Sequence, residues 1–173
     1  TSNIAIGGRS VLLALTSGDD NVAVGYGAGQ TATTTSDMIL IGSNAGNLLT
    51  GTGPDGSIAI GTGAMAVHST GARNIAIGFE AMNDTNAGST AQGSSDNIFI
   101  GYDAGGGTWA DAAQEGIVAL GHYTMTGALS ASVGATVAIG NYALNGLTQG
   151  LGNTAIGFEA LKVAATSDYN TAV

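Results

Sequence analysis

The sequence contains no cysteine, a single proline and few charged side chains. Without cysteine the chain has no disulfide framework, no thiol nucleophile and no thiolate metal site. Charged residues make up 9 % of the chain, and only Arg9, Arg73 and Lys162 carry a permanent positive charge, so the net charge is −9. Binding of nucleic acid depends on neutralising phosphates with cations. The charge balance therefore argues against nucleic acid as a partner, and against anionic membrane surfaces for the same reason.

Long apolar runs and aromatic side chains are also scarce. No run approaches the roughly 18 residues that a membrane-spanning helix needs, so we expect no membrane insertion. Aromatic residues make up 5 % of the chain, whereas glycine accounts for 30 of 173 residues. The glycines do not follow the Gly-X-Y period of collagen, and an apolar content of 44 % is too high for a disordered glycine-rich chain. This composition predicts a thin, tightly wound structure with a core of small side chains.

One short phrase, an apolar triplet followed by glycine, recurs along the whole chain. Residues 74–82 read NIAIGFEAM, and residues 153–161 read NTAIGFEAL. The glycine of the phrase stands at Gly7, Gly25, Gly42, Gly61, Gly78, Gly101, Gly121, Gly140 and Gly157, at spacings of 17 to 23 residues. A tenth copy stops at Val173. We interpret residues 1–173 as a single repeat array, and as a fragment of a longer fibre because both ends fall within a repeat.

Each copy has the alternation of a β-strand. In Ile75-Ala76-Ile77 the two isoleucines share one face and Ala76 points the other way. The β-branched residues favour a strand, and the glycine predicts a tight corner. Each repeat is therefore predicted to be a strand, a glycine corner, a second short strand and a loop. The predicted fold is all-β, a parallel β-roll or β-helix solenoid of about ten coils, with strands stacked at about 4.8 Å into a rod on the order of 45 Å long.

Two columns of the repeat have structural explanations. The repeat glycines suit positive φ or close approach of a neighbouring coil. An asparagine stands four residues before the glycine in six copies: Asn3, Asn21, Asn74, Asn97, Asn153 and Asn170. Asparagine bonds readily to nearby backbone, and stacked coils would align these amides into a ladder. We assign no catalytic role to either column.

Small residues fill two further columns, the middle of each triplet and the third position after each glycine. The first column is Ala5, Ala23, Leu40, Ala59, Ala76, Phe99, Ala119, Ala138, Ala155 and Ala172; the second is Ser10, Ala28, Ala45, Ala64, Ala81, Ala104, Thr124, Ala143 and Ala160. If the flanking isoleucines and valines fill the coil, the alanines face outward. We then expect the small-residue face to be buried between subunits. The alternative is a flattened coil whose interior is too thin for larger residues.

The repeat resembles those of trimeric fibre proteins. NIAIGFEAM, NIFIGYDAG, TVAIGNYAL and NTAIGFEAL resemble the NTAIGxxAL repeats of phage tail fibres and the head repeats of trimeric autotransporter adhesins. The resemblance covers the whole chain. It implies a left-handed parallel β-roll, a parallel homotrimer with intertwined or side-by-side chains, and an extracellular place on a virion tail fibre or a cell surface. It does not separate phage from bacterial origin.

Candidate binding residues lie in the two longest insertions, residues 83–96 and 106–116, because insertions on solenoids often bind. The only tryptophan, Trp109, stands near Asp111 and Glu115. An aromatic ring with flanking carboxylates suits a glycan receptor; alternatively, Trp109 covers a groove between subunits. Three tyrosines near the repeat corner extend the candidate receptor-binding strip: Tyr102, Tyr123 and Tyr142. The acidic residues Glu80, Asp103 and Glu159 share one repeat column, which we interpret as solvated surface charge.

No constellation of residues predicts an enzyme, and we expect no cofactor and no metal. His68 and His122 stand apart from any acid in sequence, and no GxSxG or Walker A motif occurs. The function that we expect is a non-enzymatic structural fibre segment, serving as shaft or as attachment to a host glycan or protein. The alternatives are a left-handed β-helix enzyme, either a hexapeptide acyltransferase or a glycan-cleaving tailspike, and an ice-binding solenoid.

Overall fold

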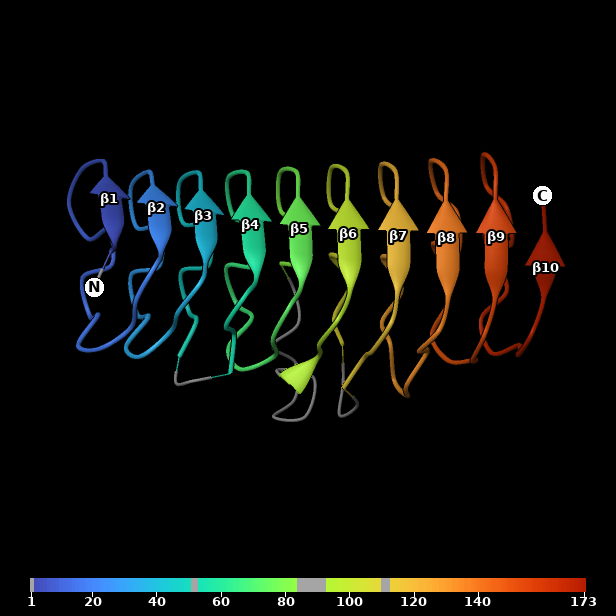
Figure 1. The fold of residues 1–173 in the computed structure, drawn as a ribbon. Coiled ribbons are helices and arrows are strands. Elements are labelled where there is room, and N and C mark those ends of the chain that lie inside the picture. The colour runs from blue at the N-terminus through green and yellow to red at the C-terminus, as the bar shows by residue number, and fades with distance from the viewer. Residues whose placement is uncertain (1, 51–52, 84–92, 110–112) are drawn as a thin grey trace.

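The computed structural model describes residues 2–50, 53–83, 93–109 and 113–173. The described chain contains ten parallel strands in one sheet, paired in chain order, and no helix. The strands are β1 (Ile4–Ile6), β2 (Val22–Val24), β3 (Ile39–Ile41), β4 (Ile58–Ile60), β5 (Ile75–Ile77), β6 (Ile98–Ile100), β7 (Val118–Leu120), β8 (Val137–Ile139), β9 (Thr154–Ile156) and β10 (Thr171–Ala172). They stand side by side as a rod with the two termini at opposite ends (Figure 1). The predicted all-β parallel solenoid is confirmed.

Equivalent positions of successive repeats pair with each other throughout the sheet. Ala59 pairs with Ala76, and Ala76 pairs with Phe99. This register survives large differences in repeat length: Gly78 and Gly101 are separated by the longest spacing, yet Ile75 still lies opposite Ile98. The described loop residues that lead into the strands lie along one edge of the rod, at the bottom of Figure 1. The register of the sheet is therefore independent of the length of the loops.

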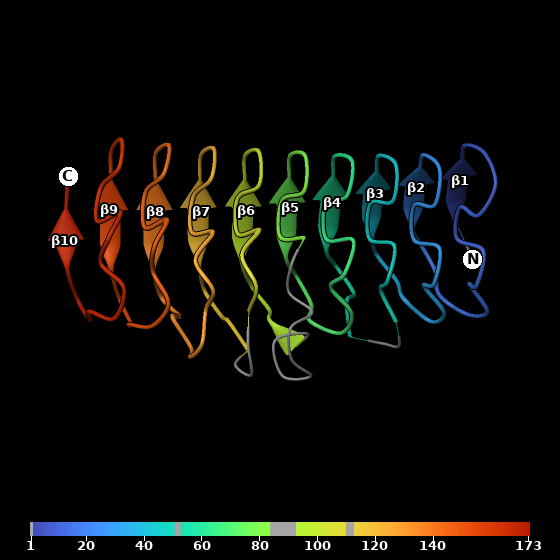
Figure 2. The same cartoon turned by 180° about the vertical axis from the view of Figure 1, so that it is seen from behind.

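The second short strand predicted after each glycine is wrong, because the chain turns there instead. The amide of Ala81 donates to the carbonyl of Gly78 at 3.4 Å, and both Glu80 and Met82 have a φ of 52°. A positive φ at the third residue of a four-residue turn is the geometry of a type II turn and interrupts a strand. These turns stack as the wall opposite the sheet, seen in front in Figure 2. Backbone bonds such as Met65 N to Ala81 O at 2.9 Å join them from coil to coil.

The corner between strand and turn requires glycine. Gly42 has a φ of 134°, a region that side chains rarely occupy. A Cβ atom on Gly42 would also lie 2.5 Å from the carbonyl oxygen of Gly61 in the next coil. Both constraints act together, so the corner excludes every other residue type.

The prediction that the alanine rows face outward between subunits is wrong. Ala76 is fully buried within the single chain, whereas its neighbours Ile75 and Ile77 are only partly covered. The alanines after the corner, such as Ala81, are fully buried too. The turns that follow each glycine fold back behind the strand and cover both alanine rows. The alanines therefore line the interior of the chain itself, as the alternative interpretation described, and the isoleucines and valines that flank the middle strand residue lie on the outer face of the sheet.

Residues six apart share the thin interior in several coils. The middle strand residue is small where the residue that ends the turn is large, giving Ala76 with Met82 and Ala119 with Met125, all fully buried. Where the strand residue is the much larger Phe99, the residue six positions on is glycine, and a Cβ on Gly105 would collide with the Phe99 ring. In these coils a large side chain is matched by a small one, as close packing demands.

The coil of β2 is filled differently. Ala23 and Gly29 are both small, and Leu12 and Leu40 reach the space beside Gly29 from the two neighbouring coils.

Candidate functional site

The outer face of the sheet is a continuous, mostly apolar surface. Two rows of side chains flank the buried middle row: Ile4, Val22, Ile39, Ile58, Ile75, Ile98, Val118, Val137, Thr154 and Thr171; and Ile6, Val24, Ile41, Ile60, Ile77, Ile100, Leu120, Ile139, Ile156 and Val173. Within the single chain Ile41 is 37 % exposed and Ile100 is 38 % exposed. Nine strands of three residues and one of two present a face of about 45 Å by 10 Å, or about 450 Å². This area is comparable with the largest apolar patch on a typical monomeric protein, and such patches are often functional.

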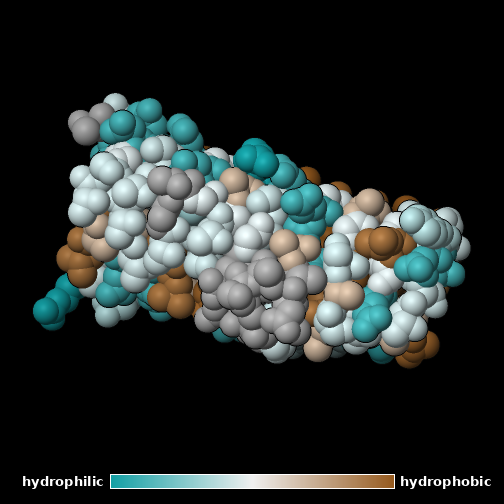
Figure 3. All heavy atoms as spheres, turned by 90° about the horizontal axis from the view of Figure 1, so that it is seen from below, coloured by the Kyte–Doolittle hydropathy of each residue, from teal (hydrophilic) through white to brown (hydrophobic). Residues whose placement is uncertain are grey.

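The edge formed by the loops is different in character. Seen from that edge, the described surface is mostly pale or teal, with smaller brown apolar areas between (Figure 3). An exposed ion pair joins Arg73 to Asp96 in the next coil, with Nε and Oδ1 at 2.7 Å. The pair raises the pKa of Arg73 and lowers that of Asp96, through their mutual hydrogen bonds first. Because both side chains are well exposed, this contact adds little to stability.

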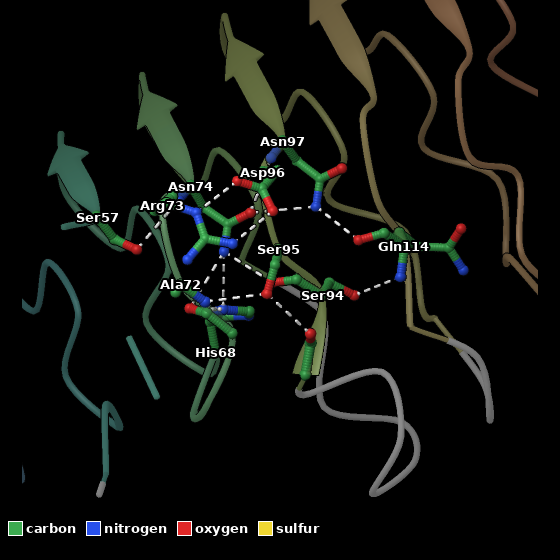
Figure 4. Close-up of polar contacts among 12 residues, drawn as sticks. Ser57, His68, Ala72, Arg73, Asn74, Ser94, Ser95, Asp96, Asn97 and Gln114 are labelled. Atoms are coloured by element: carbon green, nitrogen blue, oxygen red, sulfur yellow. Dashed lines mark hydrogen bonds and ion pairs between the residues drawn. The ribbon is translucent and has the colours of Figure 1, made fainter. Parts of the chain in front are cut away.

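Beneath this edge, the repeat asparagines form a buried hydrogen-bonded ladder (Figure 4). The Nδ2 atom of Asn97 donates to Asn74 Oδ1 at 3.1 Å and to the carbonyl of Gln114 at 2.9 Å. The backbone amide of Ile117 donates to Asn97 Oδ1 at 3.0 Å. The Asn97 amide thus satisfies two backbone groups of the next coil and bonds to the asparagine side chain of the preceding coil. Asn21 donates in the same way to Asn3, and Asn170 to Asn153, at 2.9 Å.

Copies that lack the asparagine interrupt this ladder with another means of satisfying the backbone. The Ser57 hydroxyl accepts from the backbone amide of Asn74 at 3.1 Å. At Met38 no side-chain acceptor is available, and the backbone amide of Met38 itself donates to Asn21 Oδ1. The ladder is a structural device of the interior.

His68 lies in the same polar layer and is fully buried. Its Nε2 atom lies 3.0 Å from the carbonyl oxygen of Gly71, which also accepts from Asn74 Nδ2 at 3.2 Å. Burial lowers the pKa of His68 to about 4, and the hydrogen bond to Gly71 offsets a smaller part of that shift. His68 is therefore neutral at physiological pH and has no access to a substrate.

An aromatic row follows the repeat corner over successive coils. The rings of Phe79 and Tyr102 stack at a centroid distance of 5.2 Å, and Tyr102 meets Tyr123 edge to face at 5.4 Å. Tyr123 stacks on Tyr142 at 5.4 Å, and the Lys162 ammonium lies 4.8 Å from the centre of the Tyr142 ring. We call Phe79, Tyr102, His122, Tyr123 and Tyr142 the aromatic row. It spans the coils of four neighbouring strands, β5 to β8.

Acidic side chains accompany the aromatic row. Glu80 and Asp103 occupy the column beside Phe79 and Tyr102, and Glu159 pairs with Lys162 at 2.6 Å. The Tyr102 hydroxyl raises the pKa of Tyr123 by hydrogen bonding, and the charges of Asp103 and Glu80 add smaller shifts in the same direction. The row thus combines partly exposed rings, phenol groups and carboxylates on one corner of the rod.

The structure brings together only part of the predicted receptor strip. Tyr102, Tyr123 and Tyr142 are neighbours. Trp109 does not belong with them: it is fully buried, with its ring 5.4 Å from that of Phe99. The indole packs against the Phe99 ring, so Trp109 fills the chain's own interior and neither a receptor site nor a groove between subunits. Glu115 is exposed in the loop beside Ser95, and Asp111 lies outside the described residues.

Phe79 and His122 were missed as members of the row, and Lys162 was missed as its neighbour. The two aromatic residues could have been found by aligning the copies on their glycines, because Phe79, Tyr102 and His122 each directly follow a repeat glycine. In the described ranges, no pocket opens and no three acidic or histidine side chains converge as metal ligands. The described residues also contain no helix able to cross a membrane. Comparisons with protein-family models, with curated proteins and with solved structures gave no match.

Proposed function

We propose that the chain is a non-enzymatic structural segment of an extracellular fibre, of the kind that forms phage tail fibres or surface adhesins. The observation that carries this proposal is the outer isoleucine and valine face, which runs the whole length of a rod built from in-register coils. A continuous apolar face that runs the length of a regular rod favours packing against other copies, because apolar patches of this kind often mark protein–protein contacts. The resemblance of the repeats to those of trimeric fibres favours three parallel copies.

In this arrangement the isoleucine and valine faces of three chains converge on a common axis. Each sheet contributes a flat strip of side chains, and three such strips enclose an apolar prism. The alanine rows take no part, because the chain's own turns already cover them. In this proposal the contacts between subunits are made by the residues that flank the alanines, such as Ile75 and Ile77.

The first test is the native mass of the chain in solution. A single chain has a mass of 16.8 kDa. The proposal expects a stable species of three times this mass that does not dissociate on dilution. A stable, soluble monomer would contradict it, because the outer face would then be exposed to water along its full length.

For attachment to a host, the aromatic row is the best candidate surface. Tyr102 and Tyr123 offer hydroxyl groups, and Glu80 and Asp103 offer carboxylates that accept hydrogen bonds from sugar hydroxyls. We propose a cell-surface glycan as the ligand. Binding of the native chain to immobilised host glycans would test this, comparing Tyr102→Ala with the control Tyr26→Ala, since Tyr26 is exposed outside the row. Equal binding by both variants would contradict a role for the row. No observation favours the enzyme or the ice-binding alternative.

A further inference from the structure

The tyrosines of the aromatic row lie in a geometry that favours covalent coupling. Tyr123 is the central ring: it contacts Tyr102 on one side and Tyr142 on the other, each at a centroid distance of 5.4 Å. These rings come from three consecutive coils, so their side chains are held next to each other by the sheet register of β6, β7 and β8. Tyr102 is 44 % exposed, and Tyr123 and Tyr142 are half-buried, so small oxidants can reach the row.

We propose that the row is a site of oxidative modification, at which a one-electron oxidant links Tyr123 to a neighbouring tyrosine through an intramolecular dityrosine bond. The bond joins adjacent coils of the same chain. This inference concerns the aromatic row alone, so it holds whether or not the chain is part of a fibre.

The chemistry balances with hydrogen peroxide as the terminal oxidant and a haem peroxidase as the one-electron catalyst. Each of two tyrosines loses one electron and one proton to give a phenoxyl radical. The radicals join through a carbon–carbon bond between the ring positions ortho to their oxygens. The hydrogens at those two carbons then move to the oxygens and restore both phenols. Hydrogen peroxide takes up the two electrons and two protons and becomes two molecules of water.

The arrangement of the rings decides which tyrosines couple. Radicals on free tyrosines must meet by diffusion, whereas rings already in contact react as one unit, and such proximity is worth a large rate factor. Tyr26 and Tyr169 are more exposed than the row, at 59 % and 76 %. If exposure alone decided which tyrosines couple, Tyr26 and Tyr169 would react most. Contact between rings instead favours coupling at Tyr123.

The experiment treats the native chain, in dilute solution, with horseradish-type haem peroxidase and hydrogen peroxide. Dityrosine is measured by its fluorescence, and the linked peptides are identified by mass spectrometry after proteolysis. One variant is Tyr123→Phe, which keeps the aromatic ring and removes only its hydroxyl group. The matched control is a double variant that carries both Tyr26→Phe and Tyr169→Phe. A mixture of unlabelled and ¹⁵N-labelled chains distinguishes bonds within one chain from bonds between chains.

We expect linked peptides that contain Tyr123 with Tyr102 or Tyr142, unmixed in isotope, and a loss of about fivefold or more in dityrosine for Tyr123→Phe. The control double variant should lose less than half. The proposal is overturned if no dityrosine forms, if Tyr123→Phe couples as well as the parent chain, or if the linked peptides are mainly of mixed isotope. Circular dichroism of the variants confirms that each keeps the fold.

Discussion

The ring of Phe99 occupies the space that a side chain at residue 105 would fill, and Gly105 leaves that space free. In the flanking coils the same two positions hold Ala76 with Met82 and Ala119 with Met125. Volume is therefore shared between residues six apart in the chain. This sharing makes their substitutions interdependent.

We expect Phe99→Ala and Gly105→Met to destabilise the chain separately and to compensate in part together. The first leaves a cavity that costs about 3–5 kcal/mol, and the second overpacks the coil at a cost of about 1–3 kcal/mol. Combined, they recreate the alanine–methionine pair of the neighbouring coils, although a gap remains beside Trp109. Urea unfolding of the four proteins in a double-mutant cycle measures the coupling. Simple additivity of the two costs would contradict the shared-space interpretation.

Opposite outcomes are expected for adjacent residues of β5. Ile77→Asp should leave the fold intact and weaken association between copies, because this side chain lies on the outer face. Ala76→Asp should unfold the chain, because it places an unpaired charge in a core with no room for it. Native mass and circular dichroism separate the two effects. The control Ile75→Thr introduces a side chain that the same row carries at Thr154. A folded Ala76→Asp variant would mean that the inward direction of the alanine row is wrong.

Removal of one asparagine of the ladder should be costly. Asn97→Ala leaves the Ile117 amide and the Gln114 carbonyl without their partner in a buried layer. Each unsatisfied group costs roughly 1–3 kcal/mol. Asn97→Ser should lose less, since Ser57 occupies the equivalent position and accepts a backbone amide there. Thermal unfolding ranks the three proteins, and an alanine variant as stable as the parent would show that water replaces the amide.

Acid should destabilise the fold through His68. Its pKa is lowered by burial from 6.5 to about 4, so the unfolded chain takes up a proton at a higher pH than the folded chain does. The stabilisation is complete above about pH 6.5 and is lost as the pH falls towards 4, amounting to about 3 kcal/mol. Urea unfolding at several pH values, compared with His68→Gln, isolates this contribution from that of the carboxylates. An equal pH dependence in both proteins would contradict it.

The strands and corners could be predicted because they depend on local rules. An Ile-Ala-Ile triplet has the period of a strand. The glycine that follows it adopts a positive φ that residues with a side chain rarely occupy. The alignment of Asn74 with Asn97 follows from counting back from those glycines. These features can be predicted without knowing how closely the chain turns back behind each strand.

The direction of the alanines could not be predicted, because alternation shows which residues share a face and not which face is inside. That choice depends on how closely the turn after Gly78 returns behind β5, and hence on the positive φ of Glu80 and Met82. Neither residue type signals such a conformation. Trp109 was misplaced for a related reason. Its burial depends on contact with the Phe99 ring, a relationship between residues ten apart that no local pattern signals.

Because the register is constant, position along the rod axis depends on the number of coils. Ile75 faces Ile98 although their repeats differ in length from all the others, so height along the axis is counted in coils and not in residues. The position of each strand along the rod axis therefore stays fixed whatever the length of the loop that precedes it. A loop can be lengthened in one coil without moving the strand of any other coil. Such a chain can vary what it displays at each height while its length and its outer face stay the same.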